Sequence, residues 1–166
     1  HLFILLPGLF SCPDRQVTSI DHFVVGLGPG SFSGIRTAIA AAIGLALPGK
    51  RPVNGISGAE SLAWDILREH QRSEVVIVGD ARRQRLWAAR YRCENGDIRS
   101  SMACTLLTRE AFRQSCSNTD LLVSPEFERL EEFLRDVSRA GPEILPESRY
   151  PRAEAIAHIA LRRLRD

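Results

Sequence analysis

The chain has 166 residues, about the length of one average domain or two small ones, so a hydrophobic core can form without disulfides or metals. Hydrophobic residues make up 44% and charged residues 25% of the chain, which excludes a disordered or fibrous protein. The formal charge of +2 is too small to indicate a nucleic-acid-binding protein by itself.

The cysteines and histidines show none of the spacings that are typical of metal sites or disulfide frameworks. There is no C-x-x-C, H-x-x-x-H or H-E-x-x-H pattern, so we expect no metal site and no metalloprotease activity. No stretch approaches the roughly 20 apolar residues that a membrane-spanning helix requires. We therefore expect a soluble protein in a reducing cytoplasm.

The first part of the chain alternates between strand and helix patterns. Residues 23–27 are short, β-rich and followed by glycines, which predicts a buried strand. Residues 35–47 have apolar side chains at helical spacing, and the opposite face of this helix is apolar as well. Residues 53–56 predict a second strand, and Ser57-x-x-Glu60 is a capping box that opens another helix. This order predicts parallel α/β packing.

The second part begins with three consecutive antiparallel strands, the last two of which are joined by a hairpin turn at Asn95-Gly96. A helix, a short strand and two further helices follow. The order β-β-β-α-β-α is that of a ribonuclease H-like half, and the first part follows the same plan without an opening hairpin. We therefore predict an α/β fold with a ribonuclease H-like (actin-like ATPase) duplication, its first half incomplete, with halves at 1–73 and 74–166. The predicted elements of the second part are strands at 74–78, 85–93, about 97–107 and 121–123, and helices from 108 or 109, at about 125–138, and from 151.

Two short motifs are candidates for nucleotide binding. Gly28, Gly30 and Ser31 lie in a glycine-rich turn between a strand and a helix, which resembles a dinucleotide-binding loop, but the final glycine is misplaced and no P-loop lysine follows. Asp80 follows a strand, where an actin-like site places a carboxylate. Each also has a structural interpretation, as a helix-capping turn and as an Asx turn, which the local sequence favours.

Several arginines between Arg82 and Arg92 lie near Trp87 and Tyr91, which is a composition found in RNA-binding surfaces. Strand alternation, however, places Arg90 and Arg92 on the face opposite the two aromatic residues. This pattern predicts a solvated face and a core face. A modest contact with tRNA stays open as an alternative.

The opening segment and the helix at 35–47 carry more apolar surface than a half-domain with two strands can cover. Leaving a few hundred Å² of this surface in water would forgo several kcal/mol at about 25 cal/mol per Å². We therefore predict that a partner helix pair covers both segments. The apolar residues that we assign to this partner interface are Leu5, Leu6, Leu9, Ile35, Ile39, Ala42 and Ile43.

Several sequence blocks, taken together, resemble the TsaB (YeaZ) family of tRNA threonylcarbamoyladenosine biosynthesis proteins. The order and spacing of these blocks match from residue 1 to about residue 92. Beyond that point, only Pro151-Arg152-Ala153-Glu154 resembles the family. The earlier blocks are His1 with Leu5-Leu6-Pro7, the string from Gly26 to Arg36 followed by Gly44-Leu45-Ala46, Ser57 through Ala63, and Asp80-Ala81-Arg82-Arg83 with Trp87-Ala88.

The resemblance implies an actin-like ATPase fold and a role without catalysis, with no catalytic or metal-binding residues and no required cofactor. It implies pairing with a TsaD-like transferase and a TsaE-like ATPase, with a possible homodimer and an indirect or weak tRNA contact. The first two helices of the family form the heterodimer contact. Nucleotide binding stays undecided by the resemblance.

The family's opening hairpin, with its Asp-Thr-Ser type motif, would precede His1, and its C-terminal tail would follow Asp166, so we expect a partial chain. Two alternatives remain. One is an actin-like nucleotide-dependent enzyme, or a peptidase-like paralogue, whose catalytic groups lie in the segment before His1. The other is an RNA-binding module that uses the arginines between Arg82 and Arg92.

Overall fold

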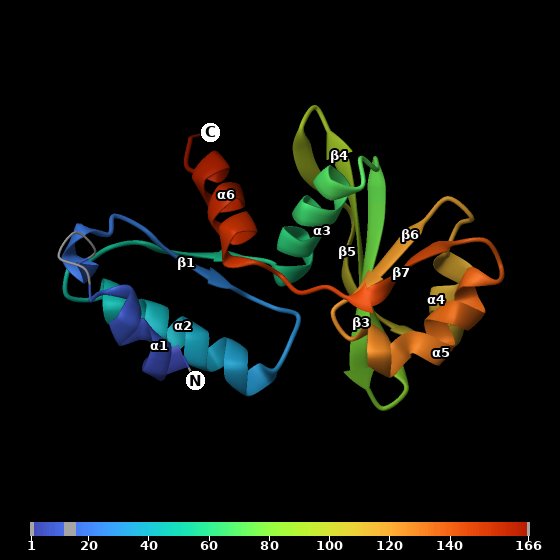
Figure 1. Cartoon of the computed structure of the whole chain (residues 1–166), viewed down its shortest axis with the longest axis horizontal. Coiled ribbons are helices and arrows are strands. Elements are labelled where there is room, and N and C mark those ends of the chain that lie inside the picture. The colour runs from blue at the N-terminus through green and yellow to red at the C-terminus, as the bar shows by residue number, and fades with distance from the viewer. Residues whose placement is uncertain (1, 12–15, 166) are drawn as a thin grey trace. The chain divides into compact units, whose positions relative to one another are not determined.

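The computed structural model describes residues 2–11 and 16–165, which form two compact units (Figure 1). The first consists of residues 1–58 together with 156–166, and the second of residues 59–155. These units reflect packing, whereas the predicted halves at 1–73 and 74–166 describe a duplication of strand order. The duplication boundary therefore stays a prediction.

The first unit is built around a parallel pair of strands, β1 (Phe23–Gly26) and β2 (Val53–Ile56), in register from Phe23 opposite Val53 to Gly26 opposite Ile56. α1 (Leu2–Leu9), a 3₁₀ turn (Val17–Ser19), α2 (Phe32–Ala46) and most of α6 (Ala153–Arg163) complete it. Figure 1 shows α1 and α2 on one side of β1 and α6 on the other. None of the helices in the described residues is both long and apolar enough to cross a membrane.

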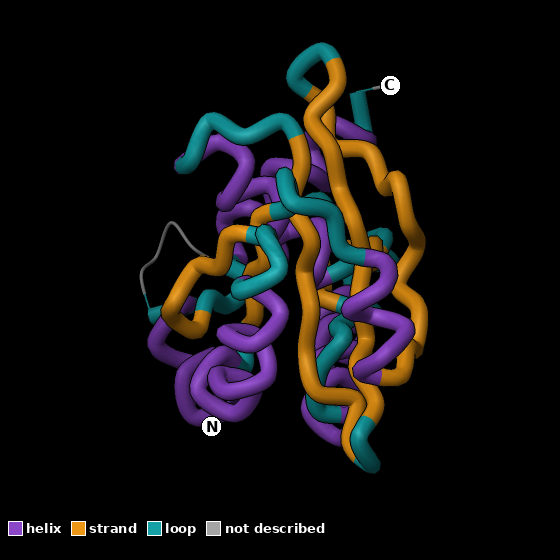
Figure 2. The backbone as a smooth tube through the Cα atoms, turned by 90° about the vertical axis from the view of Figure 1, so that its right-hand side faces the viewer, coloured by secondary structure: helices purple, strands orange, loops and turns teal. Residues whose placement is uncertain are grey.

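The second unit contains a five-stranded sheet with the order β5-β4-β3-β6-β7, whose long strands run side by side in Figure 2. β4 is antiparallel to both of its neighbours, β3 and β5, whereas β3, β6 and β7 are mutually parallel. This topology confirms the predicted ribonuclease H-like fold class. The strands are β3 (Glu74–Arg82), β4 (Arg85–Glu94), β5 (Asp97–Thr108), β6 (Leu121–Ser124) and β7 (Glu143–Ser148), and the helices are α3 (Gly58–Glu69), α4 (Arg109–Ser115) and α5 (Phe127–Ser138).

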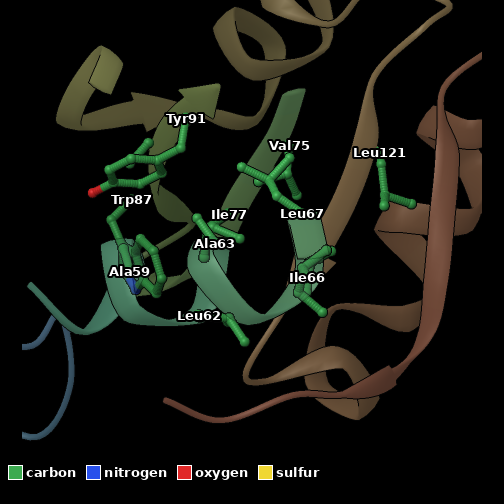
Figure 3. Packing of buried hydrophobic residues seen from close by; sticks show 12 residues of the cluster. Ala59, Leu62, Ala63, Ile66, Leu67, Val75, Ile77, Trp87, Tyr91 and Leu121 are labelled. Carbon is green, nitrogen blue, oxygen red and sulfur yellow. The ribbon is translucent and has the colours of Figure 1, made fainter. Parts of the chain in front are cut away.

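The sheet of the second unit has a hydrophobic core on each face. On one face, α3 packs against alternate residues of β3 and β4, including Ile77, Trp87 and Tyr91 (Figure 3). On the other face, α4 and α5 cover the intervening residues of β3 and β4, including Leu86 and Ala88. The predicted solvated face of β4 is therefore wrong for most of the strand, because helices from later in the chain cover it.

One strand has no counterpart among the predicted elements. β7 contains Pro146, and proline is disfavoured within a sheet because it cannot donate a backbone hydrogen bond. β7 lies at the edge of the sheet and pairs only with β6, where a missing N–H donor is tolerated. With β7 included, the elements from β3 onward follow the order β-β-β-α-β-α-β, and α6, which lies mostly in the first unit, comes next along the chain.

Candidate functional site

The clearest candidate surface of the first unit is the apolar side of α1. Leu5 is 66% exposed, and Ile4 and Leu9 are also exposed, whereas Leu6 is half-buried. α1 is almost entirely apolar, so rotating it about its axis would not hide these side chains from water. The structure thus leaves two of the three predicted α1 contact residues, Leu5 and Leu9, available to a partner.

α2 runs beside α1 in the first unit and extends the same kind of surface (Figure 1). Of its 15 residues, only Ala46 is buried. Ile43 is 50% exposed, whereas Ile35, Ile39 and Ala42 are half-buried. The seven predicted contact residues therefore range from half-buried to exposed, and none is enclosed by the chain.

Two exposed apolar residues at the ends of α2 were not among the predicted contacts. Phe32 begins the helix and Leu47 caps it, and both are strongly exposed. The guanidinium of Arg36 lies 5.2 Å from the centre of the Phe32 ring. Phe32 lies within the glycine-rich motif, which was interpreted through its glycines and Ser31. Its apolar side chain was therefore not counted among the contact residues.

The structure explains Gly28 and Ser31 in the glycine-rich turn between β1 and α2. Gly28 has a φ of +81°, and a Cβ there would come within 2.5 Å of Ile35 Cδ1, so both backbone and packing favour glycine. The Ser31 hydroxyl accepts a hydrogen bond from the Gly34 N–H at 3.3 Å and caps α2. The Gly58 N–H donates to the Gly28 carbonyl at 2.6 Å, which ties the turn to the end of β2. Gly30 is exposed, and a Cβ there would meet no neighbour.

Asp80 lies near the end of β3 in the second unit, at the turn into β4. Its Oδ1 accepts a hydrogen bond from the Arg82 N–H at 2.8 Å, which forms the predicted Asx turn. Its Oδ2 lies 3.4 Å from Arg129 Nη1 and 3.7 Å from Arg82 Nη1. The carboxylate is thus held by the turn and by two arginines. Gly28, Gly30 and Ser31 belong to the first unit, whereas Asp80 belongs to the second. Nucleotide binding at these four residues stays a prediction.

Of the two arginines predicted on the solvated face of β4, Arg92 is exposed and Arg90 is not. Arg90 has a side chain only 18% exposed, and it makes a two-pronged contact with Asp120, with Nη2 to Oδ2 at 2.8 Å. Burial alone would lower the pKa of Arg90, but the hydrogen bonds and charge of Asp120 outweigh burial and raise it. Arg82 and Arg92 pair with Asp80 and Glu94. Arg82, Arg90 and Arg92 therefore each form an ion pair within the chain.

The sequence profile of the TsaD family, described as tRNA N6-adenosine threonylcarbamoyltransferase, matches residues 8–138. The tRNA threonylcarbamoyladenosine biosynthesis protein TsaB of Escherichia coli (strain K12) is 38% identical over 93 residues, which covers 55% of this chain and 40% of that protein. TsaB of Buchnera aphidicola subsp. Acyrthosiphon pisum is 22% identical over 135 residues, covering 79% of this chain and 61% of that protein. The chain thus spans between two fifths and three fifths of these relatives.

Two solved structures from Pseudomonas aeruginosa have the same fold. One, described as an uncharacterized protein with similarity to peptidase YEAZ, has a TM-score of 0.81 and 24% identity, and the match covers 99% of this chain and 75% of that one. The other, YeaZ, has a TM-score of 0.78 and 21% identity, covering 99% and 77%. The family profile, the curated relatives and the shared fold agree with the blocks of the sequence: the chain belongs to the TsaD family of sequences, in its TsaB (YeaZ) branch.

Proposed function

We propose that this chain is a noncatalytic scaffold subunit in tRNA threonylcarbamoyladenosine synthesis and that α1 and α2 bind a TsaD-like transferase. Family membership supports the pathway, because the curated relatives are named as biosynthesis proteins for this modified nucleoside. The observation that carries the interface is α2, a largely apolar helix of 15 residues in which only Ala46 is buried.

The energetics favour a protein partner at this surface. Covering about 400 Å² of apolar surface would contribute about 10 kcal/mol at 25 cal/mol per Å², before the entropy cost of association is subtracted. The large apolar side chains exposed on α1 and α2 are aliphatic apart from Phe32, and the described part of α1 carries no charge, although α2 also exposes Ser33, Arg36 and Thr37. Such a surface suits the apolar face of one or two helices better than a polar ligand.

The assignment as a scaffold rather than an enzyme is also part of the proposal. It is supported by the state of Asp80, whose oxygens already interact with the Arg82 N–H and the side chains of Arg82 and Arg129. No cofactor is required in this proposal. A TsaE-like ATPase, an indirect or weak tRNA contact and a cytoplasmic location are further parts of it, with a homodimer as the alternative to the heterodimer.

The interface is tested by Ile43→Glu, with Leu106→Glu as the matched control, since Leu106 is an equally exposed aliphatic residue on β5. The chain is co-expressed with the TsaD-like protein of the same organism, and the amount that co-purifies is measured. We expect at least a tenfold loss for Ile43→Glu and for Leu5→Glu, and no change for the control. Unchanged co-purification of both α1 and α2 variants would refute the interface. Ile39→Glu is a weaker probe, because Ile39 is half-buried and the charge would also disturb packing.

The scaffold assignment has a separate test. Titration of ATP with magnesium into the chain, followed by calorimetry, is expected to show no binding that depends on Asp80. Strong binding that is lost in Asp80→Ala would instead favour an actin-like nucleotide-dependent enzyme.

A further inference from the structure

A groove of about 430 Å³ lies between α4 and α5 of the second unit, on the face of the sheet that these two helices cover. Its walls carry an unusual concentration of arginines around one aromatic ring, Phe133. Two acidic residues, Glu132 and Asp136, also line it, which leaves a surplus of three positive charges. The arginines of this groove are Arg109, Arg113, Arg129, Arg135 and Arg139.

Two of these arginines are oriented by the ring. The guanidinium groups of Arg109 and Arg113 each lie 5.0 Å from the centre of Phe133, which is 5% exposed. Phe133 is itself held against Phe112, with ring centres 6.0 Å apart. A guanidinium that stacks on a ring keeps N–H groups at its edge for hydrogen bonds to an anion, and it loses less conformational freedom when the anion binds.

Carboxylates lie within 4 Å of four of the five arginines of this groove. Asp136 lies 2.5 Å from Arg113 Nη2 and 3.9 Å from Arg139 Nη1, so it is shared by two arginines, and Glu110 lies 3.9 Å from Arg113 Nη1. Among the described residues, the structure gives Arg109 a ring contact and no carboxylate partner. Arg129 and Arg135 each have one carboxylate outside the groove, Asp80 and Glu131, and a guanidinium has further N–H donors.

We propose that this arginine groove binds the phosphodiester backbone of tRNA. The inference rests on the proposed function, since it gives that function a direct contact with the substrate. Planar guanidinium groups match the geometry of phosphate oxygens, and the buried ring leaves no exposed aromatic face for a base to stack on. The groove therefore recognises phosphates rather than sequence. We therefore assign the RNA contact to this groove and not to the arginines of β4, because the partly buried Arg90 of β4 is paired with Asp120.

The test is binding of the chain to a fluorescently labelled, unmodified tRNA transcript, measured by anisotropy between 50 and 200 mM salt. The principal variant is Arg109→Gln/Arg139→Gln. We expect its affinity to fall by about tenfold or more and the slope of log affinity against log salt to decrease by about two, one for each lost phosphate contact. Arg139→Gln alone, at a strongly exposed side chain, is expected to lower the slope by about one.

The charge-matched control is Arg92→Gln/Arg99→Gln, which removes two positive charges from facing positions of β4 and β5 in the same unit. We expect the control to keep its affinity within about twofold. Glu132→Gln, which removes a negative charge from the groove, is expected to tighten binding. Fluorescence of the two tryptophans, Trp64 and Trp87, during urea unfolding verifies that each variant folds.

An equal loss of affinity in the groove variant and in the control would overturn the proposal, because binding would then follow net charge alone. A chain that binds no tRNA at 50 mM salt would also overturn it. Inorganic phosphate that binds at millimolar concentration while tRNA does not would assign the groove to a free anion. Co-purification with the TsaD-like protein does not enter this assay, so failure of the groove and failure of the proposed partner interface are distinguishable.

Discussion

α2 and α5 are helices of similar length that occupy corresponding places, each between two parallel strands. They nevertheless differ strongly in how many of their residues are buried. α2 is the more apolar, and only Ala46 of its 15 residues is buried. α5 has 12 residues, half of them charged, and five are buried: Phe127, Leu130, Phe133, Leu134 and Val137. Apolar content therefore does not determine burial in this protein.

The difference lies in what each helix packs against. α5 lies on a five-stranded sheet and contacts β3, β6 and β7. The strands that α2 packs against in the described residues are β1 and β2, which form a two-stranded sheet. A two-stranded sheet offers too little surface to cover a helix that is apolar on all sides. The comparison indicates that an exposed apolar helix marks a surface that the chain's own sheet does not cover. The following predictions test that conclusion.

The largest expected effect concerns the buried ion pair in the second unit. In Arg90→Met, the buried Asp120 carboxylate loses its two-pronged partner, and we expect the free energy of unfolding to fall by about 3 to 5 kcal/mol. Urea unfolding followed by tryptophan fluorescence measures this unit, because Trp87 lies in its core and Trp64, which belongs to the same unit, is buried. Adding Asp120→Ala to Arg90→Met should recover part of the loss.

The control is Arg135→Met, which breaks an exposed pair with Glu131 on α5 and should cost about 0.5 kcal/mol or less. A comparable loss in both variants would contradict the special status of the Arg90–Asp120 pair.

A pair of core substitutions tests the comparison of the two helices directly. Leu130→Ala on α5 removes a side chain that is 2% exposed and should cost about 2 to 5 kcal/mol in the tryptophan-monitored transition. Ile43→Ala on α2 should leave that transition unchanged and alter hydrogen exchange of the α2 amides by about 0.5 kcal/mol or less. A loss above about 2 kcal/mol at Ile43 would mean that the chain itself covers α2.

Cysteine reactivity provides a measure of burial in the second unit. Burial, followed by the charge of Asp120, raises the pKa of the Cys116 thiol to about 11. At pH 8 its thiolate fraction is therefore about 100-fold below that of a thiol with the ordinary pKa, and iodoacetamide should modify it more slowly than Cys93, whose side chain is exposed. Mass spectrometry of the labelled peptides measures both rates. Equal rates would contradict the burial of Cys116.

The same shift has a defined sign for stability. The folded state keeps the Cys116 proton to a higher pH than the unfolded state, so this contribution is present below about pH 9 and is lost as the pH rises toward 11. We expect a Cys116→Ala variant to lose less stability than the parent between these two pH values, as measured by urea unfolding.

The smallest expected effects are at the helix caps. Ser31 caps α2 and Thr108 caps α4, and replacing either by alanine should cost about 1 kcal/mol locally. Only Thr108→Ala should shift the tryptophan-monitored transition, because Ser31 belongs to the first unit. A shift of that transition by Ser31→Ala would indicate that the two units unfold together.

Local patterns predicted most elements because their causes are local. β2 has the predicted bounds, the capping box begins α3 within one residue, and Asn95-Gly96 joins β4 to β5 as a hairpin. α2 begins at Phe32, three residues before the predicted start, since Ser31 provides its cap. β7 was not predicted. It contains Pro146, and whether a strand tolerates proline depends on which strands lie beside it.

The candidate sites divide in the same way. The apolar residues of α1 and α2 were identifiable from composition and spacing alone, and the structure leaves them half-buried to exposed. Arg90 was assigned to the wrong environment, because its partner Asp120 is 30 residues away. The arginine groove had no signal in the sequence, since Arg109 on α4 and Arg139 after α5 converge only when both helices pack beside one another.

The sequence by itself determined the family, the order of most elements and the excess of apolar helix surface, because each depends on a local string or a local periodicity. The tertiary structure decided which faces are covered, which arginines are paired and where positive charge collects. Burial and electrostatics depend on neighbours that the fold brings together from distant positions, and no local pattern contains that information.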